Sequence, residues 1–309
     1  MPKKPKLAPS AVIGRYAPSP TGDLHLGNLR TALVAWLHAR CHDGKFLMRI
    51  EDIDTPRMVV GSDTRILKDL EWLGLDWDGE VTYQSQRSEL YRAAIEDLLA
   101  QDMAYPCFCS RKDIRQASSA PHLHLGIYPG TCAQLTPHQV SQKSGLKSPA
   151  LRVRVPKDLQ QLSGDFVMHR ADGLFAYQLA VVVDDLDQGI TDVVRGKDLA
   201  DSTARQLFLA KLLSRQDSPT RYHHVPLMQD ENGNKMSKRD GSYSAQDWRD
   251  NGGTAESLLA TFVRSLGLPL GQSTMQESVS VDDLVALVNE WGFDRLLDDT
   301  HTEALNVEL

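Results

Sequence analysis

Arg15-Tyr-Ala-Pro-Ser-Pro-Thr-Gly-Asp-Leu-His-Leu-Gly-Asn28 is the stretch of this sequence that decides the fold. The stretch 12–16 predicts a short buried strand, and the two prolines after it favour an extended turn, because proline cannot continue a strand ladder. Apolar residues then recur at helical spacing from Leu29 to Leu37. We therefore expect a strand, a tight turn and a helix, whose first amides and dipole attract an anion.

The side chains of this turn suit a phosphate ligand. Gly22 and Gly27 allow a ligand to approach the backbone closely, and a ring N–H of His25 could donate to a phosphate oxygen. Taken alone, the same stretch could be a proline-rich turn before an ordinary helix. A second stretch far downstream, Lys235-Met-Ser-Lys-Arg239, follows the turn-forming Asn232-Gly233 pair and therefore lies on a loop.

The remaining pattern predicts an α/β core. Carboxylates follow the second predicted strand, beginning with Glu51, where ligands bind in open α/β sheets. No Gly-x-Gly-x-x-Gly motif follows a strand, which disfavours a dinucleotide dehydrogenase. The apolar run 177–185 fits a buried strand or a helix equally well. The other expected strands are 45–50, 150–155 and 190–195, and the other expected helices are 62–73, 88–102, 202–213, 254–266 and 281–291.

Three cysteines indicate a metal site between the expected core segments. Cys107 and Cys109 lie two residues apart, and Cys132 returns after a loop, a set that suits tetrahedral zinc. For the fourth ligand, His122 and His124 are chemically good donors. Cys41, at the end of the first helix, is expected to be an inert thiol.

Composition and charge describe an ordinary globular protein. Of the 309 residues, 41% are hydrophobic and 24% charged, and no 18-residue apolar run predicts a membrane span. The basic start lacks the apolar core of a signal peptide, and four cysteines suggest no disulfide framework, so we expect a cytoplasmic protein. The net charge of −7 is concentrated in residues 275–309. The nearly neutral remainder can carry a local basic face for phosphates.

The two motif stretches resemble the paired HIGH and KMSKS signatures of class I aminoacyl-tRNA synthetases. The first is similar to the glutamyl-tRNA synthetase version, and ordered landmarks of that family continue from about Gly14 to Gly241. In the family, glutamate and ATP form glutamyl-adenylate and pyrophosphate, and the glutamyl group then passes to a tRNA hydroxyl. This resemblance implies an enzyme with ATP and Mg²⁺ as the nucleotide partners.

The resemblance also implies roles for single residues. His25 and Lys238 are the implied catalytic groups, because developing charge on the phosphates requires positioned donors. Residues implied to bind ATP are His25, Gly27, Asn28, Lys235 and Lys238. Residues implied to bind L-glutamate are Arg15, Ala17, Ser19, Glu51, Tyr177 and Arg195. Guanidinium groups match a substrate carboxylate, and Glu51 matches its ammonium.

Several features are similar to the branch of the family that glutamylates queuosine in tRNA(Asp). After Arg195-Gly196 the chain reads Lys-Asp-Leu-Ala-Asp, where larger enzymes of the family usually have Glu-Asp-His. The cysteine spacing resembles the zinc site of this branch, in which a tyrosine completes the ligands, so Tyr128 is favoured and His124 is the alternative. The chain is also shorter than charging enzymes, which carry anticodon-binding domains. This branch activates glutamate without tRNA and then esterifies queuosine in the anticodon.

We therefore expect a class I synthetase fold, with a Rossmann-like parallel sheet split by an α+β insertion that bears one structural Zn²⁺. The expected segments are the first half of the core (1–100), the insertion (101–174), the second half (175–228), and the loop with a C-terminal helical segment (229–309). Expected partners are L-glutamate, ATP and queuosine-containing tRNA(Asp), with no membrane and a monomeric state. The alternatives are a truncated glutamyl-tRNA synthetase that charges the 3′ end and a non-catalytic binding protein.

Overall fold

The structure, a computed structural model, describes residues 11–110, 112–114, 128–156, 164–215, 220–228, 243–268 and 278–297. The chain packs as two compact units. The first unit contains Met1–Tyr83, Ile190–Ala200 and Thr220–Leu309, and the second contains Gln84–Gly189 and Asp201–Pro219. No helix in the described ranges is both long and apolar enough to span a bilayer.

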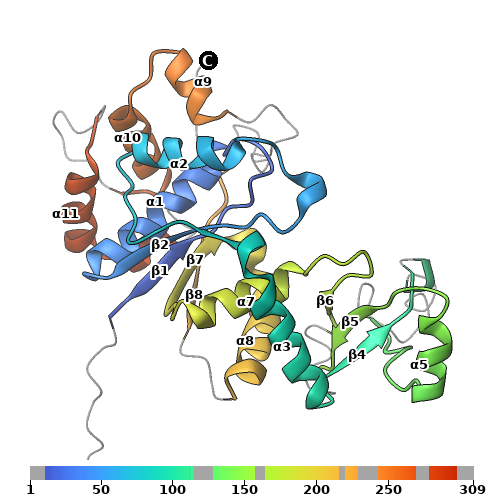
Figure 1. The fold of residues 1–309 in the computed structure, drawn as a ribbon. Coiled ribbons are helices and arrows are strands. Elements are labelled where there is room, and N and C mark those ends of the chain that lie inside the picture. Colours follow the sequence, from blue (N-terminus) through green and yellow to red (C-terminus); the bar gives the residue numbers. More distant parts are fainter. Residues whose placement is uncertain are drawn as a thin grey trace, which may run out of the picture. The chain divides into compact units, whose positions relative to one another are not determined.

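Parallel strands form the centre of the first unit (Figure 1). β1 (Ile13–Tyr16), β2 (Lys45–Ile50) and β3 (Thr82–Tyr83) are hydrogen-bonded in that order, and β7 (Asp192–Gly196) pairs with β8 (Arg221–Val225). β7 begins beside β1, because the amide just before it donates to the carbonyl of the first β1 residue at 2.9 Å. The carboxyl ends of all these strands therefore lie along one edge.

The helix α1 (Leu26–Cys41) is the centre of the hydrophobic core in this unit. Its residues from Ala32 to Ala39 are all buried, so this helix is covered on every side and not on the single face that the sequence pattern indicated. Around it the chain places α2 (Ser62–Trp72), α9 (Ala245–Asp250), α10 (Ala255–Ser265) and α11 (Val281–Trp291). α10 and α11 each begin with a complete capping box, which explains their sharp starts after loops.

The described part of the second unit combines three longer helices and one short helix with a small antiparallel sheet. The longer helices are α3 (Ser88–Ala100), α7 (Tyr177–Asp187) and α8 (Thr203–Ser214). The sheet runs β4 (Ala104–Cys107), β5 (Ala150–Val153) and β6 (Val167–His169), and a short helix α5 (Pro137–Ser144) precedes β5. The ambiguous run 177–185 is thus helical, and it buries its apolar residues 179–183.

A buried carboxylate holds the helices of the second unit together. Asp184 of α7 is fully buried and accepts hydrogen bonds from Gln84 Nε2 at 2.7 Å, Arg87 Nε at 2.6 Å and the Tyr91 hydroxyl at 2.9 Å. A buried charge is tolerable only with such partners, since unpaired it would lose its hydration without compensation. Asp184 therefore ties α7 to α3 and to the turn before it.

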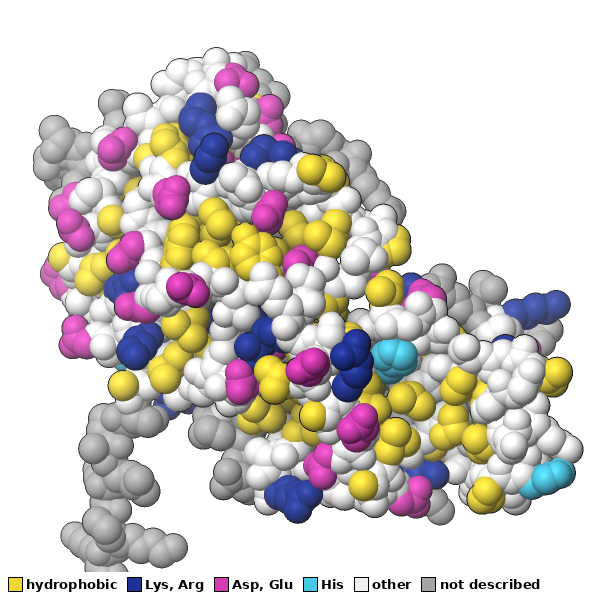
Figure 2. Space-filling model, viewed as in Figure 1, with side chains coloured by type: hydrophobic (Ala, Val, Ile, Leu, Met, Phe, Trp, Pro, Cys, Tyr) yellow, Lys and Arg dark blue, Asp and Glu magenta, His cyan; other side chains and the backbone are white. Residues whose placement is uncertain are grey.

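The visible surface carries charges of both signs. On the face drawn in Figure 2, Lys and Arg side chains are interspersed with Asp and Glu, and the described residues of this face form no continuous basic area. This mixed pattern agrees with the nearly neutral charge of the chain before its acidic end.

Candidate active site at the carboxyl edge of the parallel strands

Three charged side chains from three neighbouring strands lie at the carboxyl edge of the sheet. Arg15 is in β1, Glu51 directly follows β2, and Arg195 is in β7. Their exposed fractions are 5%, 7% and 4%, respectively. Charged side chains are rarely this buried without a function or a partner. The edge thus offers two guanidinium groups and one carboxylate to a small zwitterionic ligand.

Arg195 is held in place by two side chains of the adjacent strand β8. Its Nε donates to His224 Nε2 at 3.4 Å, and its guanidinium lies over the ring of Tyr222 at 4.8 Å from the centroid. Burial, followed by the charge of Arg195, lowers the pKa of His224 below its ordinary value, so the imidazole stays neutral and can accept this hydrogen bond. Neither His224 nor Tyr222 has a role predicted from the sequence, because their contact with Arg195 depends on the pairing of β7 with β8.

The turn between β1 and α1 is tied to the segment around Glu51. The Glu51 amide donates to the Pro18 carbonyl at 3.0 Å, between the expected substrate-binding residues Ala17 and Ser19. The Glu51 carboxylate lies 3.7 Å from an Arg49 guanidinium nitrogen. The positive charge of Arg49, which is completely buried, offsets part of the cost of burying Glu51.

His25 is the N-cap of α1, and this role determines which of its ring nitrogens carries the proton. Its Nδ1 accepts a hydrogen bond from the Asn28 amide at 3.3 Å. An accepting nitrogen carries no proton, so the neutral ring has its N–H at Nε2. A Cβ at Gly27 would lie 3.0 Å from two atoms of the His25 ring, so only glycine leaves the ring where it is.

The hydroxyl of Tyr16 completes the first turn of this helix. It donates to the Asn28 carbonyl at 3.1 Å, and burial raises the pKa of Tyr16 well above its usual range, so the hydroxyl stays a donor. The strand before the motif and the helix after it are therefore joined directly. His25, Gly27 and Asn28 thus lie together at the start of α1, where the sequence predicts an anion-binding site.

Lys235 and Lys238 lie outside the described residues, but both ends of their segment are described. Upstream, the Met228 side chain lies 3.7 Å from the position of a Cβ at Gly27. Downstream, the Tyr243 carbonyl accepts from the Leu26 amide at 3.1 Å, and Ser244 forms an isolated bridge with His25. The two ends of the segment therefore meet at the start of α1.

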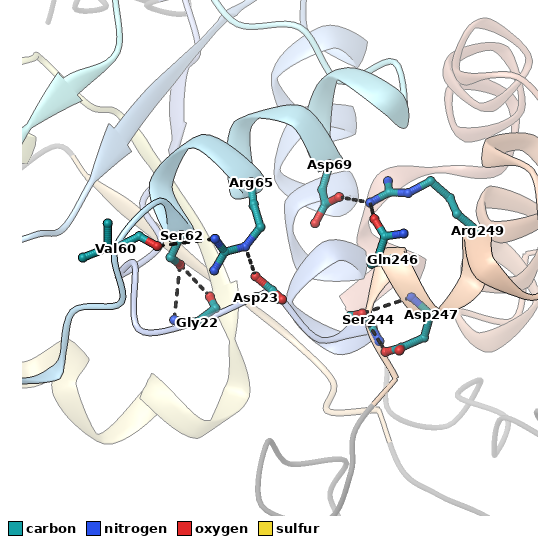
Figure 3. Close-up of polar contacts among 10 residues, drawn as sticks. All are labelled: Gly22, Asp23, Val60, Ser62, Arg65, Asp69, Ser244, Gln246, Asp247 and Arg249. Atoms are coloured by element: carbon teal, nitrogen blue, oxygen red, sulfur yellow. Dashed lines mark hydrogen bonds and ion pairs between the residues drawn. The ribbon is translucent and has the colours of Figure 1, made fainter.

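A polar network connects the motif turn with α2 and α9 (Figure 3). Asp23 accepts from Arg65 of α2 at 2.5 Å, and Asp69 of the same helix accepts from Arg249 of α9 at 2.7 Å. The Ser62 hydroxyl of α2 also donates to the Gly22 carbonyl at 2.8 Å. These contacts join the turn before His25 to α2. They also join α9, the helix that follows the lysine-bearing segment, to α2. Sequence patterns did not reveal them, because the partners are far apart in the chain.

Tyr177, the remaining expected glutamate-binding residue, belongs to the second unit. It is the first residue of α7 and is partly buried. Ala176 before it is the N-cap of α7 and has an extended backbone, so Tyr177 lies in the first turn of the helix.

The three cysteines and Tyr128, the favoured fourth metal ligand, come together in the second unit. The sulfur atoms of Cys109 and Cys132 are 3.6 Å apart, and the Tyr128 hydroxyl lies 3.3 Å from Cys107 Sγ and 3.5 Å from Cys109 Sγ. A tetrahedral zinc with bonds of about 2.3 Å to sulfur separates its ligands by roughly 3.8 Å. The donor types and their spacing thus fit Zn²⁺.

The surroundings of this cluster shift the pKa values of two of its thiols in opposite directions. Burial alone would raise the pKa of Cys107, but hydrogen bonds from the Tyr128 hydroxyl, the Cys109 amide and Arg152 lower it below the usual value. Burial raises the pKa of Cys109 to about 11. The Arg152 guanidinium lies 3.9 Å from the centroid of the Tyr128 ring, where it balances part of the negative charge of the cluster.

The other metal-site expectations have different outcomes. His122 and His124 lie outside the described residues, so the structure favours Tyr128 only by its nearness to the sulfur atoms. Cys41 stands apart from the cluster, and burial raises the pKa of its thiol to about 11, which agrees with an inert cysteine.

Comparison with known proteins identifies the class to which this site and fold belong. Residues 11–291 match the family model described as tRNA synthetases class I (E and Q), catalytic domain. The chain belongs to this family. It is therefore an enzyme of the class I ligase type, and the expected α/β class I synthetase fold is confirmed.

Individual relatives within this family are similar to the chain over most of its length. A glutamyl-Q tRNA(Asp) synthetase of Nocardia farcinica is 48% identical over 268 residues, covering 83% of this chain and 85% of the relative. One from Geobacter sulfurreducens is 46% identical over 280 residues, covering 85% and 87%. A crystal structure of glutamate-tRNA synthetase from Elizabethkingia anophelis has a TM-score of 0.81 at 27% identity and covers 97% of this chain and 69% of that one.

Proposed function

We propose that this enzyme activates L-glutamate with ATP in the absence of tRNA and then transfers the glutamyl group to queuosine in the anticodon of tRNA(Asp). The observation that carries the proposal is the set of buried charges Arg15, Glu51 and Arg195 at the edge of three neighbouring strands. It is supported by relatives at 40–48% identity that are named glutamyl-Q tRNA(Asp) synthetase.

Glutamate recognition follows from the charges of the site. The forked guanidinium groups of Arg15 and Arg195 match the oxygens of the substrate carboxylates, and Glu51 matches the ammonium. Because His224 and Tyr222 hold Arg195, little side-chain entropy is lost when glutamate binds. Tyr177, Ala17 and Ser19 complete the proposed glutamate site.

In the first step, a carboxylate oxygen of glutamate attacks the α-phosphorus of ATP, and pyrophosphate leaves. Negative charge builds on the phosphate oxygens, and the Nε2–H of His25 and the helix start at Gly27 and Asn28 supply fixed donors for it. Lys238, assisted by Lys235, neutralises the leaving pyrophosphate. Mg²⁺ accompanies ATP and shields its phosphate charge.

In the second step, a hydroxyl of the queuosine cyclopentenediol attacks the carbonyl carbon of glutamyl-adenylate, and AMP leaves. The active site then receives the anticodon loop of tRNA(Asp). In the second unit, Cys107, Cys109, Tyr128 and Cys132 would hold one Zn²⁺ that fixes the end of β4 to the segment returning at Cys132. We further propose a cytoplasmic monomer with the segments 1–100, 101–174, 175–228 and 229–309.

Two assays test this proposal, one of ATP–pyrophosphate exchange and one of glutamate transfer to tRNA. ATP–pyrophosphate exchange should proceed with glutamate in the absence of tRNA, and aspartate and glutamine should support little exchange. Transfer of glutamate should occur with tRNA from cells that make queuosine and should be absent with tRNA from cells that lack it. Exchange that requires tRNA, or equal transfer to both tRNA pools, would contradict the proposal.

A further inference from the structure

A second cluster of ligating side chains lies at the opposite end of the parallel strands. Asp192 is the first residue of β7, His223 is the middle residue of β8, and His38 is in the last turn of α1. They border a cavity of about 600 Å³. Arg221 and Phe293 also line this cavity. Because it faces the amino ends of the strands, it is separate from the proposed site of glutamate activation.

The ligand atoms of the cluster are spaced as they would be around one metal ion. Asp192 Oδ1 lies 3.0 Å from His223 Nε2 and 3.7 Å from His38 Nε2. All three ligand atoms lie within 4.8 Å of one another. Bonds of about 2.0–2.2 Å from zinc to nitrogen and oxygen place tetrahedral ligands about 3.3–3.5 Å apart. A small adjustment of the imidazoles would therefore suffice.

His38 supplies an independent sign that something is bound here. Its ring is only 4% exposed, and among the described residues its Nδ1 has no hydrogen-bond partner. Its Nε2, at 3.7 Å from the carboxylate, is too far for a normal hydrogen bond. A buried imidazole with neither nitrogen in a normal hydrogen bond needs an explanation, and a metal bond to Nε2 would provide one.

Asp192 can serve as a ligand and keep its supporting contacts. Its Oδ2 accepts from the Thr191 hydroxyl at 2.8 Å and from Arg221 Nη2 at 2.7 Å, whereas its Oδ1 faces the two histidines. Hydrogen bonds to the outer oxygen of a ligating carboxylate orient it and are common around metal sites. Arg221 also donates through Nε to Oδ1 at 2.8 Å and would compete with a cation, but its side chain is 58% exposed and can turn outward.

We propose that His38, Asp192 and His223 form a second metal site, which takes a divalent transition metal of the zinc type. Two imidazoles and one carboxylate suit such a cation, and water from the cavity supplies the fourth ligand. The ring of Phe293 packs against His38 at a centroid distance of 4.5 Å. The metal therefore stabilises the chain segment after α11 against the start of the sheet, and its role is structural.

The test uses the complete protein, stripped of metal and titrated with Co²⁺ or Zn²⁺. The wild type should bind two equivalents, one with the near-ultraviolet thiolate band of the cysteine site and one without it. His223→Gln should weaken the second equivalent by about 100-fold or more and leave the thiolate band unchanged. The matched control, His138→Gln, changes an exposed histidine of α5 and should retain both equivalents.

A second variant keeps the test decisive if His223→Gln folds poorly. Arg221→Ala removes the cation that competes for Asp192 and should tighten the second equivalent by about tenfold, which a purely structural ion pair would not produce. Zn²⁺ should also raise the unfolding temperature of the wild type more than that of His223→Gln. A wild type that binds only the thiolate equivalent, or an Arg221→Ala variant that binds the second equivalent no more tightly, would overturn the proposal.

Discussion

The Gly27→Ala substitution should displace the His25 ring without destabilising the fold. It therefore tests the role of the ring position alone. The added Cβ would lie 3.0 Å from both Cε1 and Nδ1 of that ring, whereas nonbonded atoms prefer about 3.5–4.0 Å. The ring must therefore shift by a few tenths of an ångström. A misplacement of about 1 Å in a catalytic group costs on the order of 100-fold in rate, so this smaller shift should cost on the order of 10-fold. Alanine also favours a helix over glycine by up to about 1 kcal/mol, so stability should not fall.

Glutamate-dependent ATP–pyrophosphate exchange is the assay for this variant. We expect kcat to fall by about 10-fold with little change in the KM for glutamate, and the thermal unfolding temperature to stay level or rise. Gly145→Ala is the matched control, because a Cβ there meets no atom closer than 3.6 Å and should leave exchange unchanged. A Gly27→Ala enzyme with the kcat of the wild type would refute the role given to the His25 ring.

Three further substitutions test separate parts of the account. Arg195→Lys loses the forked guanidinium and its contacts to β8, so the KM for glutamate in the exchange assay should rise by about 10- to 100-fold while the KM for ATP stays constant. Tyr128→Phe should weaken Zn²⁺ at the cysteine site by about tenfold or more in a chelator competition, whereas an unchanged affinity would favour His124 as the ligand. Asp184→Asn removes the fully buried carboxylate that accepts from Arg87, Gln84 and Tyr91, and it should lower the free energy of unfolding by about 3 kcal/mol in urea, while Asp187→Asn, which alters an exposed partner of the same arginine, should change it little.

The local structure of the active-site motif could be predicted from the sequence because it depends on neighbouring residues. Proline, glycine and the helical spacing after Asn28 determine the turn and the start of α1, and the structure has both. The sequence also predicted that Glu51 lies at the carboxyl edge of the sheet. This prediction needs only a strand and the polar residue that directly follows it.

Contacts between distant segments could not be predicted in this way. Asp69 and Arg249 meet only because α2 and α9 pack together, and His224 supports Arg195 only because β7 and β8 are paired in that register. Likewise, the run 177–185 has an apolar pattern that fits both a strand and a helix, and its packing in the second unit selects the helix. Sequence spacing carries no signal for such tertiary contacts.

The most direct test of the central claim is to locate the glutamate that the enzyme transfers to tRNA. Labelled glutamate would be transferred to total tRNA that contains queuosine, and the tRNA would then be digested and its nucleosides separated. We predict label on the queuosine nucleoside of tRNA(Asp), which survives removal of the 3′-terminal nucleotide. Label on tRNA(Glu) that disappears with the 3′ end would contradict the account and make this a charging enzyme.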